Sequence, residues 1–438
     1  MSELDIGLLV AAVTIVLLLL GVPVAFALGL VGIGFLVVFD GWFAAEFMAQ
    51  QLFESLDSFA LLSIPMFILM GGVIASSRAG PDLYEALDRW LYKVPGGLMA
   101  SNLGACALFA ALSGSSPATC AAIGKLGIPE MRKRGYPAGL ACGSIAAGGT
   151  LGILIPPSIT LIVYGIATET SIGRLFMAGI IPGIMLVLMF IAYSIVAARI
   201  WGHEVRDPNL AYTLREKLEV LPRVGPFLGV VIAVLYVLYG GIATPSEAAG
   251  VGAFLCLLLV MVIYGLWRFR DLWPIFRDSM REAVMILLII AAAEIFSYMM
   301  SYLFITQTLA QSVAAMEVSR WVMMGYINLF LLVAGFFLPP VAVILMTAPT
   351  LLPIITSLGF DPIWFAIILT INMEIGLITP PVGLNLYVIN SIAPDVRLPT
   401  ILKGTIPFFL LMVLAIVLLS IFPGLALWLP NAMMGDAI

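Results

Sequence analysis

The chain is poor in charge: 10% of its 438 residues are Asp, Glu, Lys or Arg, whereas 62% are hydrophobic and the mean hydropathy is +1.15. A soluble protein of this length needs far more surface charge, so this scarcity excludes a set of soluble domains. Uncharged runs such as 6–39 and 224–246 can cross a hydrocarbon core of roughly 30 Å as helices. They are continuous rather than alternating, which excludes a barrel. The sequence therefore predicts an all-α polytopic membrane protein.

Residues for metal binding and catalysis are also scarce. The only histidine is His203, and the four cysteines lie in apolar segments, so we expect buried small hydrophobes and no metal or disulfide framework. An intramembrane serine protease using Ser113 or Ser115 would need a base in reach. His203 lies in a polar linker and Lys125 is poorly placed, so we expect no enzyme, no cofactor and no nucleic-acid partner. No Gly-x-x-x-x-Gly-Lys-Ser/Thr loop is present, and transport must draw on a gradient or a partner.

Comparison of the chain with itself reveals a repeat, with chance similarity in an apolar sequence as the alternative. Gly152-Ile-Leu-Ile-Pro156-Pro157 recurs as Gly376-Leu-Ile-Thr-Pro380-Pro381, 224 positions later. The same offset relates Pro129 to Pro353 and Gly135 to Gly359, and an offset of 222 relates Pro23 to Pro245. The sequence thus predicts two repeats, 1–198 and 223–438, joined by a polar linker at 199–222 with a turn at Asp207-Pro208.

Orientation follows from the basic residues, which collect on the cytoplasmic side of membrane proteins. With the N-terminus outside, 18 of the 20 Lys and Arg residues fall on the cytoplasmic side, leaving Arg174 and Arg320 outside. The linker is then cytoplasmic. Each half reads as about five crossings plus one re-entrant hairpin with a broken helix, and an odd number of crossings inverts the second half. The first apolar segment follows an acidic N-terminus, so we expect it to be a retained helix.

Four segments break the helical pattern at membrane depth: 113–119, 148–158, 337–340 followed by 346–350, and 376–385. Proline removes a backbone N–H and glycine permits the non-helical angles that follow. Freed backbone groups survive at this depth only where protein or a hydrated cavity receives them. Two hairpin tips and two broken helices, within transport elements at about 97–170 and 321–392, are what a midplane transport site requires. Taken singly, a Pro-Pro pair or a Ser/Gly turn can equally be a kink or a packing contact.

Carbonyl and hydroxyl oxygens in these segments suit a hard monovalent cation such as Na⁺. The cation candidates are Ser113, Gly114, Ser115, Ser116, Thr119, Gly149, Thr150, Pro339, Pro340, Thr347, Gly376 and Thr379. Half-helix N-termini offer partial positive charge to a carboxylate. The substrate candidates are Ser115, Ser116, Pro156, Pro157, Ser158, Pro380, Pro381, Asn385 and the intramembrane carboxylate Glu374. A second acid in an apolar helix, Glu294, can instead hold helices together.

The chain resembles the large membrane (M) subunit of tripartite ATP-independent periplasmic (TRAP) transporters, within the wider ion-transporter superfamily. The resemblance rests on 113–119, 128–135, 148–158, 168–173, 243–249 and 376–385, and it spans nearly the whole chain. It implies an elevator-type mechanism in the bacterial inner membrane and Na⁺ as the coupling ion. It also implies a small four-helix (Q type) subunit, a periplasmic (P type) binding protein that delivers substrate, and a small organic acid such as a C4-dicarboxylate, a sugar acid or sialic acid.

Two positions depart from that family. Where the second hairpin commonly presents an acid, this chain has Leu338-Pro339-Pro340, and Pro117 stands where a small aliphatic residue is usual. The alternative function is a stand-alone anion or Na⁺/H⁺ carrier of the same superfamily. A channel is disfavoured because no ring of charged or carbonyl-rich repeats is evident.

Overall fold

The computed structural model describes residues 2–91, 97–200, 212–316 and 318–435, and these are helical throughout, with no strand among them. Seven of the described helices are long and apolar enough to cross a membrane, or eight if the bent pair 48–54 and 59–75 counts as one span. The all-α membrane fold expected from the sequence is confirmed. The expected Asp207-Pro208 turn lies outside the described residues.

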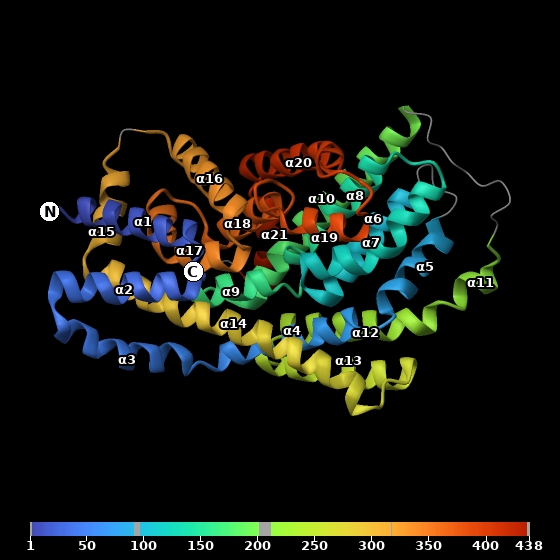
Figure 1. Cartoon of the computed structure of the whole chain (residues 1–438), viewed down its shortest axis with the longest axis horizontal. Coiled ribbons are helices and arrows are strands. Elements are labelled where there is room, and N and C mark those ends of the chain that lie inside the picture. Colours follow the sequence, from blue (N-terminus) through green and yellow to red (C-terminus); the bar gives the residue numbers. More distant parts are fainter. Residues whose placement is uncertain (1, 92–96, 201–211, 317, 436–438) are drawn as a thin grey trace.

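One group of helices comes from the start of the first half and the start of the second, and its long members form a layer (Figure 1). It contains α1 (Glu3–Leu19), α2 (Val24–Asp40), α3 (Trp42–Leu56), η1 (Phe59–Leu62), α4 (Ser63–Ala75), α12 (Leu221–Tyr239), α13 (Pro245–Tyr264), α14 (Phe269–Tyr302) and α15 (Ile305–Ala314). The α14 helix packs against α2 and α4, and α13 packs against α4. The expected division of the first apolar run is confirmed, because α1 ends before Pro23 and α2 begins after it.

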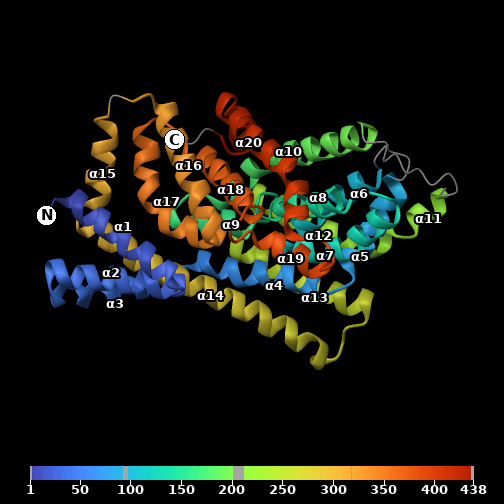
Figure 2. The same cartoon turned by 45° about the horizontal axis from the view of Figure 1, so that its top comes forward.

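Two helical hairpins lie above this layer. The first consists of α6 (Gly97–Ser113) and α7 (Ser116–Lys133), and the second of α16 (Arg320–Phe337) and α17 (Pro340–Ser357). Figure 2 shows the second hairpin beside α15 and the first toward the other end, with α18, α9 and α19 between them. The segment 346–350, expected to be broken, is helical. Pro349 and Pro353 each remove one N–H, and the rest of α17 continues through them.

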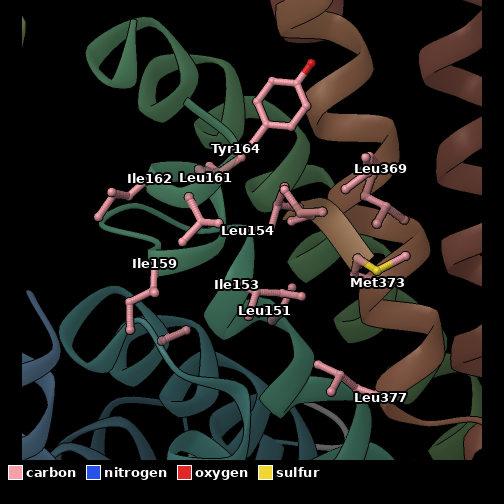
Figure 3. Close-up of a cluster of buried hydrophobic side chains, with 14 of the residues drawn as sticks. Leu151, Ile153, Leu154, Ile159, Leu161, Ile162, Tyr164, Leu369, Met373 and Leu377 are labelled. Carbon is pink, nitrogen blue, oxygen red and sulfur yellow. The ribbon is translucent and has the colours of Figure 1, made fainter. Parts of the chain in front are cut away.

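Two broken helices run between the hairpins. In the first, α8 (Ala138–Thr150) passes through η2 (Leu151–Ile153) and a non-helical turn to α9 (Ile159–Ala167). In the second, a non-helical segment separates α18 (Pro362–Leu377) from α19 (Leu384–Ile392). An apolar cluster joins the two, with Leu369, Met373 and Leu377 of α18 facing Leu151 and Leu154 (Figure 3). Long helices follow each: α10 (Ile172–Ile200) after the first, and α20 (Leu398–Ile421) with α21 (Gly424–Met434) after the second.

Glycine allows α20 to approach α8 closely. A Cβ on Gly404 would overlap the Gly139 carbonyl, and a Cβ on Gly143 would overlap the backbone of Gly404. Close backbone approach through small residues is the usual way that membrane helices gain van der Waals contact without a hydrophobic driving force. This contact fixes α20 of the second half against the first broken helix.

The α5 helix (Ala79–Leu91), which the sequence did not predict, connects the lower layer to the first hairpin. Tyr264 of α13 donates its hydroxyl proton to Asp82 at 2.9 Å. Further along α5, the Asp88 carboxylate lies 3.7 Å from the guanidinium of Arg134, the residue just after α7. Burial raises the pKa of the Asp88 carboxyl, while the Arg134 charge opposes that shift. The same short helix thus contacts both the layer and the hairpin. Two more helices, α15 and α21, were not predicted as separate elements.

Candidate functional site

The first hairpin turns at Gly114 and Ser115. Gly114 has φ +61, a conformation that glycine adopts without the penalty of a Cβ. Pro117 stands in the first turn of α7, where the missing N–H costs no helical hydrogen bond. Inside the tip, the Ser113 and Thr119 hydroxyls are 3.1 Å apart, and Thr119 donates to the Ser115 carbonyl at 2.8 Å. The sequence-predicted tip therefore forms one compact group of oxygens.

The tip sits against the first break, and glycines make that approach possible. A Cβ on Gly114 would lie 2.9 Å from the Pro157 carbonyl oxygen, and a Cβ on Gly152 would lie 2.8 Å from the Ser115 carbonyl. A Cβ on Gly149 would overlap the Cys120 sulfur. These glycines let backbone carbonyls of the hairpin and of the break come together.

Neutral oxygens dominate this contact. Ser116 Oγ donates to the Thr150 carbonyl at 3.2 Å, and Ser113, Ser116, Thr119 and Thr150 are all buried. Carbonyl and hydroxyl oxygens are the donors that hard cations prefer. Seven cation candidates, Ser113, Gly114, Ser115, Ser116, Thr119, Gly149 and Thr150, thus lie at one contact whose chemistry fits Na⁺.

Ser158 has a structural task at the first break. Its hydroxyl donates to the Ile153 carbonyl at 2.5 Å and accepts from the N–H of Leu161 at 3.3 Å. Through the second bond it caps the N-terminus of α9. Pro156 and Pro157 are buried beside it. These three substrate candidates lie together, but the Ser158 hydroxyl already has protein partners.

The second tip meets its own break in a similar way. A Cβ on Gly376 would overlap the carbonyl of Gly335, and the N–H of Val382 donates to the Phe336 carbonyl at 3.2 Å. The Thr379 hydroxyl donates to Ile375 within α18. Among the candidates here, Pro339, Pro380 and Pro381 are exposed, whereas the corresponding parts of the first half are largely buried.

Two candidates, Thr347 and Glu374, lie away from either tip contact. The Thr347 hydroxyl donates to Val343 within α17, about two turns beyond the tip residue Pro340. Glu374 is fully buried in α18, and neither carboxylate oxygen has a hydrogen-bond partner among the described residues. Burial of an unpaired carboxylate costs several kcal/mol, so the structure calls for a neutral acid or an accompanying cation there.

Asn385 connects the second break to the first half. Its Nδ2 donates to the Ala146 carbonyl of α8 at 3.0 Å, while its buried Oδ1 has no partner among the described residues. Sequence reasoning missed a second such amide, Asn102 of α6. Both of its polar atoms are buried without a partner in the described chain, facing Gly127 of α7. The sequence does hold a signal for this residue, because Asn102 is an amide within the apolar segment 98–112.

The model of the tripartite ATP-independent periplasmic transporter, DctM component, matches residues 11–425. The chain belongs to the DctM family. This member is 37% identical over 385 residues, 88% of the chain and 89% of the relative, to the C4-dicarboxylate TRAP transporter large permease protein DctM of Pseudomonas aeruginosa. It is 35% identical over 413 residues to the isethionate TRAP transporter permease protein DctMQ of Oleidesulfovibrio alaskensis, covering 94% of the chain and 64% of that relative.

The fold of this DctM-family chain matches a solved transporter. The YdaH transporter of Alcanivorax borkumensis superposes with a TM-score of 0.65 over 90% of this chain and 91% of that one, at 15% identity, which supports the fold alone. The chain is therefore a TRAP transporter large permease subunit with several membrane-spanning helices, and not an enzyme.

Proposed function

We propose that this permease imports a small organic acid anion by Na⁺ symport. The observation that carries the proposal is the enclosed contact between the first tip and the first break. Ser113 and Thr119 bring hydroxyls to it, and Ser115, Thr150 and Pro157 bring carbonyls. This oxygen set carries no titratable group, which favours a metal cation over a proton as the coupled ion.

We propose further that the chain consists of two inverted repeats that move as an elevator. Helices α7 and α17 each have 18 residues and begin at Ser116 and Pro340, 224 positions apart. Each hairpin also packs on the broken helix of the other half, α7 on α19 and α17 on α9. These observations favour transport elements at 97–170 and 321–392 moving as one body, joined across the cytoplasmic linker 199–222.

The substrate class is proposed from charge. Helices α9 and α19 begin at the two breaks, and helix N-termini attract carboxylates. Relatives are named for C4-dicarboxylate, isethionate and sialic acid, which are anions, and for ectoine, a zwitterion that also carries a carboxylate. A C4-dicarboxylate, a sugar acid or sialic acid fits this chemistry.

The proposed partners are a small four-helix (Q type) membrane subunit and a periplasmic (P type) binding protein, in the inner membrane of a bacterium. The family description, a component of a tripartite system, supports them. The alternative is a stand-alone carrier. Deletion of the genes for the two partners distinguishes the tripartite transporter from the stand-alone carrier, because uptake that survives both deletions supports the stand-alone carrier.

Uptake in proteoliposomes tests the coupling ion. With both partners present, we expect an inward Na⁺ gradient to drive accumulation of labelled substrate, and an equal K⁺ gradient to serve as the matched control. Accumulation driven equally well by a proton gradient in Na⁺-free buffer would overturn Na⁺ coupling.

A further inference from the structure

A cavity of about 430 Å³ lies outside the site described above. One wall comes from the loop between α9 and α10, including Glu169 and Thr170. The other comes from Ser58 and Ala60 near η1 and from the turn between α12 and α13, including Pro245. Two motifs that the transport site leaves unused, 168–173 and 243–249, therefore meet at this cavity.

The polar groups of the second motif are used by the fold. Thr244 and Glu247 form a capping box, in which the Glu247 carboxylate accepts from the Thr244 N–H at 2.8 Å and Thr244 Oγ1 accepts from the Glu247 N–H at 3.3 Å. The Ser246 hydroxyl donates to the Phe59 carbonyl at 2.6 Å. This motif builds the wall and offers no free charge to the cavity.

Glu169 of the first motif, in contrast, is not used by the fold and offers a charge to the cavity. It is exposed, and its carboxylate has no hydrogen bond or ion pair among the described residues. Its backbone is left-handed at φ +53, just past the end of α9, where a Cβ is unfavourable. After α7, α12 and α13 the chain places Gly135, Gly241 and Gly265 at left-handed positions. At the cavity it carries a carboxylate instead.

The remaining lining is uncharged: it has three hydroxyl side chains, Ser58, Thr170 and Ser171, and apolar groups that include Ile172, Leu238 and Met434. Among the described residues, Glu169 is the only charged residue of the lining. No basic side chain lines the cavity among the described residues, and the guanidinium of Arg174 donates to the carbonyl of the lining residue Met434. A divalent metal ion usually takes several carboxylate ligands, whereas this lining has a single carboxylate, and no group of three or more His, Cys, Asp or Glu side chains occurs among the described residues. A guanidinium or ammonium head on an aliphatic stem matches the carboxylate and the apolar walls together.

We propose that this cavity binds the head group of an arginine or lysine, with the carboxylate of Glu169 as its counter-ion and the apolar walls around its stem. The group can come from a free amino acid or from a basic side chain of a soluble partner. Under the proposed topology the cavity opens to the periplasm, and only this location rests on the proposed function.

Two charged thiol reagents measure the preference directly. Ser171 lines the cavity and is exposed, so Ser171→Cys provides a reactive group beside Glu169, while the four native cysteines are buried. The measured quantity is the rate of modification by the cationic methanethiosulfonate MTSET divided by the rate for the anionic MTSES. We expect this ratio to be about fivefold higher in Ser171→Cys than in Ser171→Cys/Glu169→Gln. Ile242→Cys, exposed but outside the lining, is the matched control, and its ratio should not depend on Glu169.

Protection experiments distinguish the two sources. Free L-arginine at millimolar concentration should slow modification of Ser171→Cys when Glu169 is present and not when it is Gln. If purified binding protein protects and arginine does not, the source is a partner side chain. A rate ratio unaffected by Glu169→Gln overturns the proposal, as does the absence of protection by either.

A second variant separates charge from folding. Glu169→Gly removes the carboxylate and also the left-handed penalty, so we expect an unchanged or higher thermal midpoint together with loss of the reagent preference. Glu169→Asp should keep part of the preference. Because these assays need neither substrate nor a Na⁺ gradient, their failure leaves the proposed symport untouched, and failure of symport leaves the cavity untouched.

Discussion

The Asn385 side chain of α19 donates a 3.0 Å hydrogen bond to the Ala146 carbonyl of α8. The two residues are 239 positions apart and belong to different broken helices. Asn385→Leu keeps the side-chain volume and removes this contact. We expect a loss of about 1 kcal/mol in stability, measured as a lower thermal midpoint in detergent. Ser391→Ala, which removes an exposed hydroxyl of the same helix, should leave the midpoint unchanged.

The first tip should determine the affinity for Na⁺. Ser113→Ala and Thr119→Val remove hydroxyl oxygens, and each should raise the Na⁺ concentration for half-maximal uptake about tenfold if a charge-assisted contact is worth ~1.5 kcal/mol. Pro340→Ala at the second tip restores an N–H and leaves the neighbouring carbonyls in place, so the half-maximal concentration should stay unchanged. The measurement is Na⁺-dependent uptake normalised to protein in the membrane. The opposite pattern would move the cation site to the second hairpin.

Glu374→Gln tests the neutral state of the buried acid. Gln has nearly the same shape as a protonated carboxyl, so we expect wild-type abundance in the membrane and a free energy of unfolding within about 1 kcal/mol of the wild type, seen as a closely similar thermal midpoint. Glu374→Lys places an unpaired charge in the same apolar site and should abolish the folded protein, as judged by size-exclusion profiles. A Gln variant that fails to fold would show that the carboxylate is charged and paired with a cation.

The contact between α8 and α20 should not tolerate a methyl group. Gly404→Ala would place a Cβ into the Gly139 carbonyl, and overpacking of this kind costs about 1–3 kcal/mol or more. We expect a clearly lower thermal midpoint. Gly250→Ala, in α13, meets nothing within 4 Å and serves as the matched control. Equal midpoints for the two variants would contradict the packing described here.

The proposed orientation is testable with cysteines in three segments. Lys133→Cys and Leu214→Cys should react with an impermeant maleimide only from the cytoplasm, and Ile242→Cys only from the periplasm. All three native side chains are exposed, whereas nearby Met131 is fully buried and unsuitable for labelling. Labelling at Lys133→Cys from outside would reverse the topology.

The hairpin tips and breaks were predictable because glycine and proline impose their backbone consequences locally. Gly114 at its left-handed φ and the Pro156-Pro157 pair without N–H groups act on their own backbone, so their effect could be expected without knowing any distant contact. Sequence reasoning gave the wrong result at 346–350, since neighbouring turns of α17 tolerate Pro349. It also missed α5, because a short charged segment is typical of a loop. The partners of Asp82 and Asp88, Tyr264 and Arg134, are remote in the sequence. Contacts between segments as remote as Ala146 and Asn385 leave no local pattern.

The prolines of the second half have a consequence for how an anion can be recognised there. Pro339-Pro340 and Pro380-Pro381 contribute carbonyls but no N–H groups, and the N–H of Val382 is already bonded to Phe336. At the start of α19, the N–H groups of Leu386 and Tyr387 already donate to the Gly383 carbonyl, and the side-chain amide of Asn385 donates to Ala146. The donors left at this break are therefore the backbone N–H groups of Leu384 and Asn385. A carboxylate that binds at this break would form its hydrogen bonds with the main chain rather than with side chains. Substitution of side chains around the second break should then alter the transport rate more than the choice of substrate. Selection among anions would have to take place before the anion reaches the permease.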